Sequence, residues 1–321
     1  MSTVTTAAAP SAARQDIERE HSAPPVGARP PSYCGPDFDS LAAVDPHALA
    51  AASRRWAATI GIVGVGRVGV LIAHALACAG IGGLRLDDPR GVEATDVGLG
   101  AHHGADVGAR RASAAASRLG ADYASTDVGV GNVGGCDLVV LTSAHVTNPT
   151  GTARLICEGV PHLTVTYGAE RTDVGPLVLP GRGACVNCVD LHRSDQDPTW
   201  PETWRSLRRA SVTSRTPQPG LLALTAAAQT AALVLAAVDD GETPARRGRP
   251  PAGSTSADRA ETADGAGAPD GAGGPGGAGG LDGAAARSVS TTTWPDLTTA
   301  RQEWTVHPRC GCSGMAPLPG G

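Results

Sequence analysis

Apolar residues in the first half of the chain fall in short runs separated by glycine-rich turns. The runs at residues 59–63, 83–86, 137–141 and 163–166 are rich in Val, Leu and Ile, which is typical of buried strands. Alanine-rich segments at 70–79 and 106–119 have the composition of helices. Because strands that alternate with helices pair in parallel, the pattern predicts an α/β fold with a doubly wound sheet.

The second half of the chain has a different pattern. Residues 190–204 are polar, and within them 190–198 gathers His192, Arg193, Asp195 and Asp197. We expect a loop whose charges cap and pair locally, with a catalytic site as the alternative. Residues 288–293 and 298–306 predict a hairpin. The apolar run at 221–238 approaches membrane-spanning length, but its many alanines and Gln229 make it only weakly hydrophobic. We therefore expect a buried core helix there and no membrane contact.

The composition divides the chain into segments. Residues 1–54 are low in large apolar residues and predict a disordered or loosely attached segment, with one helix near Asp45–Trp56 leading into the first strand. Residues 55–312 form the expected folded domain. Within it, residues 240–286 are of low complexity and predict a disordered insertion, and residues 313–321 form a tail.

Charge limits the classes of function. The 321 residues carry a net charge of -5, and all 26 basic residues are arginines, since the sequence contains no lysine. This excludes lysine-based Schiff-base chemistry and disfavours a nucleic-acid partner. The N-terminus lacks the pattern of a secretory signal, so we expect a cytoplasmic protein.

A glycine motif directly follows the first predicted strand. Gly64, Gly66 and Gly69 have the spacing of a nucleotide-binding turn, in which a helix N-terminus presents free N–H groups to a phosphate. The second strand ends at Asp87 and Asp88, where such folds place a carboxylate for ribose, and spacing does not decide between the two acids. The motif suits ATP and NAD equally well, and a turn that binds nothing is the alternative.

Four of the eight cysteines form two close pairs. Cys185 and Cys188 are separated by two residues, and Cys310 and Cys312 by one. Two such pairs can supply the four sulfurs of a structural zinc site, with a disulfide or a redox dithiol as the alternative. The adjacent His102 and His103 are also potential metal ligands, but we expect them to be solvated.

These motifs together resemble the ThiF family, the ThiF/MoeB/HesA group of ubiquitin-activating-enzyme-like adenylyltransferases. The resemblance rests on the glycine turn, the acidic strand end, the stretch 174–201 and the stretch 304–312. It is strongest toward actinobacterial ThiF-like proteins of peptide-modification pathways that form azolines with cyclodehydratases.

The resemblance implies an ATP-binding fold that activates the carboxylate of a peptide or small protein as an acyl-adenylate. It also implies a homodimer and a structural role for zinc. Gly64, Gly66 and Gly69 would line the nucleotide, Asp87 or Asp88 would hold the ribose, and Arg111 falls where adenylating members carry a phosphate-binding lysine. ATP with magnesium and zinc are thus the implied cofactors.

The sequence departs from the adenylating members at two places. The loop after the acidic strand end, from Asp96 to His103, lacks their Arg-Gln pair, and Ala144 stands where they carry a magnesium-binding aspartate. No catalytic residue can be assigned from the sequence. Three hypotheses follow: an adenylyltransferase-type nucleotide-binding protein, a catalytically silent scaffold or partner protein, and an NAD-dependent oxidoreductase.

Overall fold

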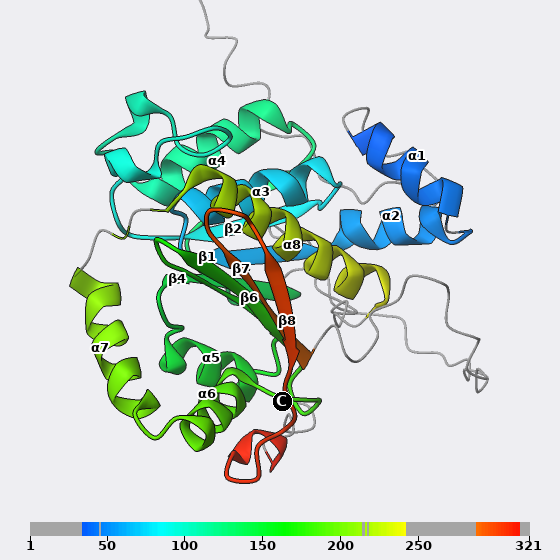
Figure 1. Cartoon of the computed structure of the whole chain (residues 1–321). Coiled ribbons are helices and arrows are strands. Elements are labelled where there is room, and N and C mark those ends of the chain that lie inside the picture. The colour runs from blue at the N-terminus through cyan, green and yellow to red at the C-terminus, as the bar shows by residue number, and fades with distance from the viewer. Residues whose placement is uncertain (1–33, 45, 214–215, 217, 242–286, 315–321) are drawn as a thin grey trace, which may run out of the picture.

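The computed structural model describes residues 34–44, 46–213, 216, 218–241 and 287–314. A single eight-stranded sheet crosses the molecule in the order β3-β2-β1-β4-β5-β6-β7-β8 (Figure 1). The first five strands in that order are parallel, and the last three are antiparallel. The strands are β1 (Thr59–Val63), β2 (Gly83–Asp87), β3 (Asp127–Val130), β4 (Leu138–Ala144), β5 (His162–Tyr167), β6 (Arg171–Val178), β7 (Ser288–Thr293) and β8 (Thr299–Glu303).

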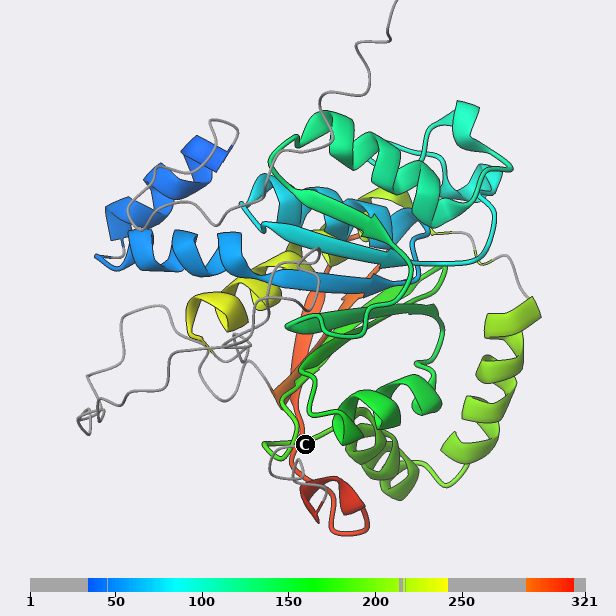
Figure 2. The same cartoon turned by 180° about the vertical axis from the view of Figure 1, so that it is seen from behind.

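Helices cover the two faces of this sheet, as Figures 1 and 2 show from opposite sides. One layer contains α3 and α8, and the other contains α5 and α6. The helices are α1 (Gly35–Val44), α2 (Ala48–Ala57), α3 (Arg67–Cys78), α4 (Arg111–Asp122), α5 (Pro149–Cys157), α6 (Val186–Gln196), α7 (Trp200–Thr213) and α8 (Gly220–Asp239). Short 3-10 turns occur at Ala94–Asp96, Gly104–Asp106 and Gly311–Gly314. The predicted α/β doubly wound class is confirmed.

The predicted strands form the centre of the sheet because their side chains are apolar on both faces. Ile60, Ile62, Leu84, Leu138 and Leu163 are fully buried. The order of the strands reverses between β1 and β4, so the carboxyl ends of these two strands flank the crevice in which open α/β sheets bind ligands.

The apolar helix α8 lies inside this fold. By length and composition alone it could cross a membrane, and half of its most apolar window is buried. Leu222, Ala226, Thr230 and Val234 on α8 are fully buried, and the helix packs against α3, α2 and β6. Its buried face therefore agrees with the core helix that the sequence predicts.

Several expectations need correction. The polar segment at 190–198 is not a loop, because α6 continues to Gln196 and α7 begins at Trp200. The helix expected from residue 106 begins at Arg111, after a turn in which Gly108 has a φ of 92°. In the segment 1–54, α1 was not predicted, whereas α2 is the helix expected near Asp45–Trp56, and its Arg55 is ion-paired with Asp239 on α8 at 2.6 Å.

The predicted hairpin is present as β7 and β8, and it extends the main sheet beside β6 instead of standing apart. Most of the predicted insertion at 240–286 and of the predicted tail at 313–321 lies outside the described residues.

Candidate functional site: a glycine loop with buried charges and a four-cysteine cluster

The glycine loop joins β1 to α3 at the crevice. Gly64 has a φ of 89°, a conformation that L side chains rarely adopt. A Cβ at Gly69 would lie 2.0 Å from the carbonyl oxygen of Gly64, so only glycine lets the helix approach the loop this closely. Gly66 is the N-cap of α3, and no side chain caps the helix there. The first N–H groups of α3 are therefore available to an anion.

Of the two candidate acids, Asp88 is the one whose side chain meets the glycine loop. Its Oδ2 accepts a hydrogen bond from the main-chain N–H of Val65 at 2.9 Å, and its side chain is 1% exposed. Asp87 contributes only its main-chain carbonyl, which accepts from Gly64 at 2.9 Å. The structure thus favours Asp88 as the acid of this site.

Asp88 is held as a carboxylate. Burial by itself raises the pKa of Asp88, but the hydrogen bonds and charge of Arg90 outweigh burial and place the pKa below its ordinary value. Arg90 donates from its main-chain N and from Nε to Oδ1, both at 3.0 Å. Arg90 was not among the site residues expected from the sequence.

Arg111 lies beside the loop as expected, but it is engaged by two carboxylates. Its Nε donates to Asp96 Oδ2 at 2.7 Å, and one terminal nitrogen lies 3.5 Å from Asp88 Oδ2. The side chains of Arg111 and Asp96 are 7% and 8% exposed. Asp96 Oδ1 faces Gly66, since a Cβ there would lie 3.3 Å from it. An internal ion pair therefore lies at the start of α3.

Two further side chains border this charge cluster. Tyr167, at the end of β5, interacts electrostatically with Arg90 and Arg111, and burial raises the pKa of its phenol, so it stays protonated near neutral pH. His102 is 1% exposed, and its Nε2 lies 2.7 Å from the carbonyl oxygen of Val65. The expectation of a solvated pair is thus wrong for His102, while His103 is exposed and its Nδ1 accepts from the N–H of Ala105.

The end of β4, on the other side of the crevice, carries no carboxylate. Ala144 is followed by His145, whose φ is 62° and whose Nε2 lies 2.9 Å from Thr216 Oγ1. Burial lowers the pKa of His145, so its imidazole is neutral at pH 7. The residues that directly end β4 therefore supply no charge, although the pocket beside His145 is also lined by Asp173, Asp190 and Arg193.

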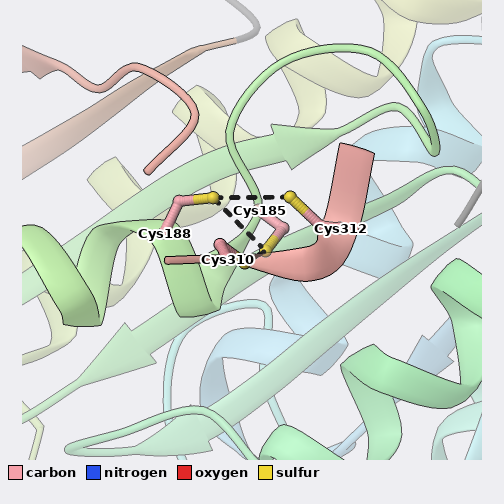
Figure 3. Close-up of side chains that lie close together, drawn as sticks. All are labelled: Cys185, Cys188, Cys310 and Cys312. Carbon is pink, nitrogen blue, oxygen red and sulfur yellow. Dashed lines mark hydrogen bonds between the residues drawn. The ribbon is translucent and has the colours of Figure 1, made fainter. Parts of the chain in front are cut away.

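The four paired cysteines meet in space, as Figure 3 shows. Their sulfurs all lie within 4.8 Å of one another and all four residues are buried. The separations are 3.8 Å for Cys185–Cys188, 3.6 Å for Cys185–Cys310 and 3.4 Å for Cys188–Cys312. A hydrogen bond with Cys185 lowers the pKa of Cys188, and the same contact with burial raises the pKa of Cys185. The cluster can hold a metal ion.

Residues on α6 hold the C-terminal cysteines in place. Asn187 Nδ2 donates to the sulfur of Cys310 at 3.2 Å. His307 is buried, accepts the N–H of Arg309 at Nδ1, and donates from Nε2 to Asp195 at 2.8 Å. Arg309 also pairs with Asp195. The charges of the 190–198 segment therefore pair from a helix and with distant parts of the chain, since Arg193 also pairs with Asp173, and the expected local pairing is wrong for them.

The glycine loop and the cysteine cluster lie at opposite ends of the strands. The glycine loop follows the carboxyl end of β1, whereas β6 runs antiparallel and ends with Val178 beside His162, the first residue of β5. Cys185 comes shortly after that end of β6. The cysteine cluster thus ties the C-terminal segment to the end of the strands that lies away from the crevice.

Comparison with known proteins shows which family the sequence around the glycine loop is similar to. Residues 48–130 match the family model of the ThiF family, and this range contains the glycine loop, Asp88, Asp96 and Arg111. No curated protein matches the sequence.

The ThiF-family segment is part of a fold shared with solved structures. E. coli MccB with AMPCPP and SeMet MccA superposes with a TM-score of 0.62 at 16% identity, covering 90% of this chain and 75% of MccB. E. coli MccB with ATP gives 0.60 at 16% identity, covering 88% and 74%. PaaA gives 0.58 at 15% identity, covering 84% and 82%. At these identities the likeness establishes the fold.

Proposed function

We propose that this chain is an adenylyltransferase-type, nucleotide-binding protein that acts on or escorts a peptide or small protein. The observation that carries the proposal is the glycine loop of a ThiF-family segment with the carboxylate of Asp88 bonded to it. Gly64, Gly66 and Gly69 line the nucleotide in this proposal, and Asp88 holds the ribose.

The donors around the loop suit an anion with many acceptor atoms. Beside the free N–H groups of α3, the side-chain nitrogens Arg67 Nε and Gln218 Nε2 are buried and have no hydrogen-bond acceptor among the described residues. Arg67 connects the start of α3 to Gln218, because it is the first residue of the helix and donates to the carbonyl oxygen of Gln218 at 2.7 Å. A nucleotide phosphate would satisfy such donors.

The second candidate is a catalytically silent partner protein of the same fold. It is favoured by Ala144, which leaves the end of β4 without a carboxylate for magnesium, and by the engagement of Arg111 with Asp96 and Asp88. Groups that stabilise the charge on a phosphoryl group during its transfer each contribute several kcal/mol to catalysis. Their loss therefore lowers the catalytic rate more than it lowers the affinity for the nucleotide.

We infer that the four-cysteine cluster holds zinc in a structural role. Four sulfurs about 2.3 Å from a zinc ion lie about 3.8 Å apart, close to the separations found here. With all four positions filled by cysteine, the site leaves no place for a substrate. Cys185, Cys188, Cys310 and Cys312 therefore fasten the C-terminus to the domain, which we take to span residues 55–312.

A peptide is the substrate or partner class that we favour. The MccB neighbours include complexes with MccA, and one of them is the microcin C7 biosynthetic enzyme MccB with N-formylated MccA. We expect the protein to be a cytoplasmic homodimer, and sedimentation velocity of the zinc-loaded protein measures its oligomeric state.

Magnesium-dependent exchange of pyrophosphate into ATP tests the activity. Exchange that depends on an added peptide supports the adenylyltransferase. Nucleotide binding without exchange supports the silent partner, and tight, saturable binding of NAD in place of ATP would support an oxidoreductase. A Gly66→Asp variant, which places a carboxylate where phosphate should lie, is the control for each assay.

A further inference from the structure

The carboxylate of Asp96 occupies an unusual place for a residue beside a phosphate-binding loop. Its Oδ2 accepts from the N–H of Glu93 at 2.8 Å and from Arg111 at 2.7 Å, which fixes the side chain. Its Oδ1 then faces Gly66, the residue that caps α3. A fixed negative charge therefore stands at the positive end of the helix dipole.

From this arrangement, we infer that Asp96 is a specificity-determining charge that makes the site prefer nucleotides of low phosphate charge over a triphosphate. The inference rests on the proposed nucleotide site.

The charges that surround the loop support the assignment. Arg111 and Arg90 are balanced by Asp96 and Asp88, which leaves Arg67 as the unbalanced cation at the start of α3. Removing the charge of Asp96 adds one positive charge to this set without changing the backbone. Because the pair is almost fully buried, water screens this charge weakly.

A second observation concerns donors near Arg67, whose own Nε is buried without an acceptor among the described residues and whose guanidinium donates to the main chain of Gln218. Gln218 is only 8% exposed, and its Nε2 lacks a hydrogen-bond partner in the part of the chain that the structure describes. The site therefore combines free donors with a reduced positive charge. That combination suits a ligand with few phosphates, such as a nucleoside monophosphate or an adenylate, better than ATP.

Asp96→Asn is the matched test, because asparagine has the same shape and can still accept the hydrogen bonds of Glu93 and Arg111 through its oxygen. Calorimetry with adenosine, AMP, ADP and ATP in the absence of divalent cations measures the dependence on charge. We expect the variant to bind ATP about tenfold more tightly, AMP less than about threefold more tightly, and adenosine equally. The control is Asp106→Asn, which removes an acid that pairs with the partly exposed Arg118 and should change no affinity.

The wild-type protein provides a readout that does not depend on the variant folding. The inference requires that wild type bind ATP no more than about threefold more tightly than AMP. A wild-type preference for ATP above tenfold, or equal affinities of wild type and Asp96→Asn for all four ligands, overturns it and leaves the nucleotide site intact. Absence of binding by every ligand to both proteins overturns the nucleotide site as well.

Discussion

The glycine loop and the cysteine cluster are both buried groups of polar side chains, but they are satisfied in different ways. At the glycine loop, Asp88 and Asp96 find their counter-charges in Arg90 and Arg111, so the cluster is complete without a ligand. At the cysteine cluster, four thiols contact one another and the amide of Asn187. The first region is stabilised by its own residues, whereas the second is organised for an ion.

This difference has consequences for function. A ligand at the glycine loop must compete with an existing ion pair, so its affinity is set by a difference between two interactions. A metal ion at the cysteines forms its bonds to sulfur without breaking an ion pair, because it displaces only protons. We therefore expect metal to determine stability and the charge cluster to determine selectivity.

Loss of the metal should have the largest effect. Because zinc bound only by the folded state stabilises it, Cys188→Ser should lower the free energy of unfolding by about 5 kcal/mol in zinc-containing buffer. Chelation of wild type should have a similar effect, and metal content by mass spectrometry should fall to zero in the variant. The control is Cys157→Ser, since Cys157 is exposed and lies outside the cluster. Equal thermal midpoints for Cys188→Ser and wild type would contradict a structural metal.

Breaking the internal ion pair should come next. Arg111→Gln leaves Asp96 buried without a counter-charge, and such losses cost about 4 kcal/mol. Urea unfolding measures the change. Arg154→Gln, which removes one partner of an exposed pair with Glu158, should cost less than about 1 kcal/mol. If the two variants lose equal stability, the charge cluster is not the buried, self-neutralised unit described above.

The pH dependence of stability should distinguish a buried histidine at the start of β5, His162, from the buried carboxylate of Asp88. Burial lowers the pKa of His162 to about 4. The folded chain therefore holds a neutral imidazole, and its contribution is complete above about pH 6.5 and is lost as pH falls toward 4. The loss over that range is about 3 kcal/mol.

Urea midpoints measured from pH 7.5 to 4 check this prediction, and His162→Gln should flatten the curve. Asp88 behaves differently, because its pKa is lowered in the folded state: its contribution stays complete above about pH 4 and is lost only as pH falls below that value. A curve for His162→Gln that is as steep as that of wild type would show that another group is responsible.

The smallest effect concerns the support of the cysteine cluster. Asn187→Ala removes the hydrogen bond to the sulfur of Cys310, and the loss of such a supporting contact should accelerate zinc release about tenfold. Competition with a chromogenic chelator follows the release. Asn132→Ala, which removes a surface amide that caps Gly134, should leave the rate unchanged. Identical rates for all three proteins would exclude a role for Asn187 in holding the metal.

Much of the fold follows from local pattern. β1, β2, β4 and β5 are apolar runs of strand length, and α8 is a long apolar run, so burial alone identifies them. β3 was missed because it is a half-exposed edge strand with a glycine at its centre, and β6 because Pro176 argues against a strand in the sheet interior. α6 has only two buried residues and a weak apolar pattern.

The two candidate sites also differ in how far the sequence predicts them. The cysteine cluster was predictable because its spacing specifies its chemistry. The pairing of Asp96 with Arg111 was not, because the two residues are joined only by the fold of an irregular loop. Tyr167 and His145 lie at the ends of β5 and β4, and no local motif marks either residue. Their place beside the crevice follows only from the order of the strands.

The most direct test of the account is calorimetric titration of the zinc-loaded protein with adenine nucleotides, using wild type, Gly66→Asn and Gly66→Asp. A side chain at Gly66 meets only the far ends of Asp96 and Arg111, so both variants should fold. The account predicts binding to wild type and to the asparagine variant, and at least about tenfold weaker binding to the aspartate variant, which adds a negative charge. Equal affinities for the two variants, or no binding to wild type, would contradict it.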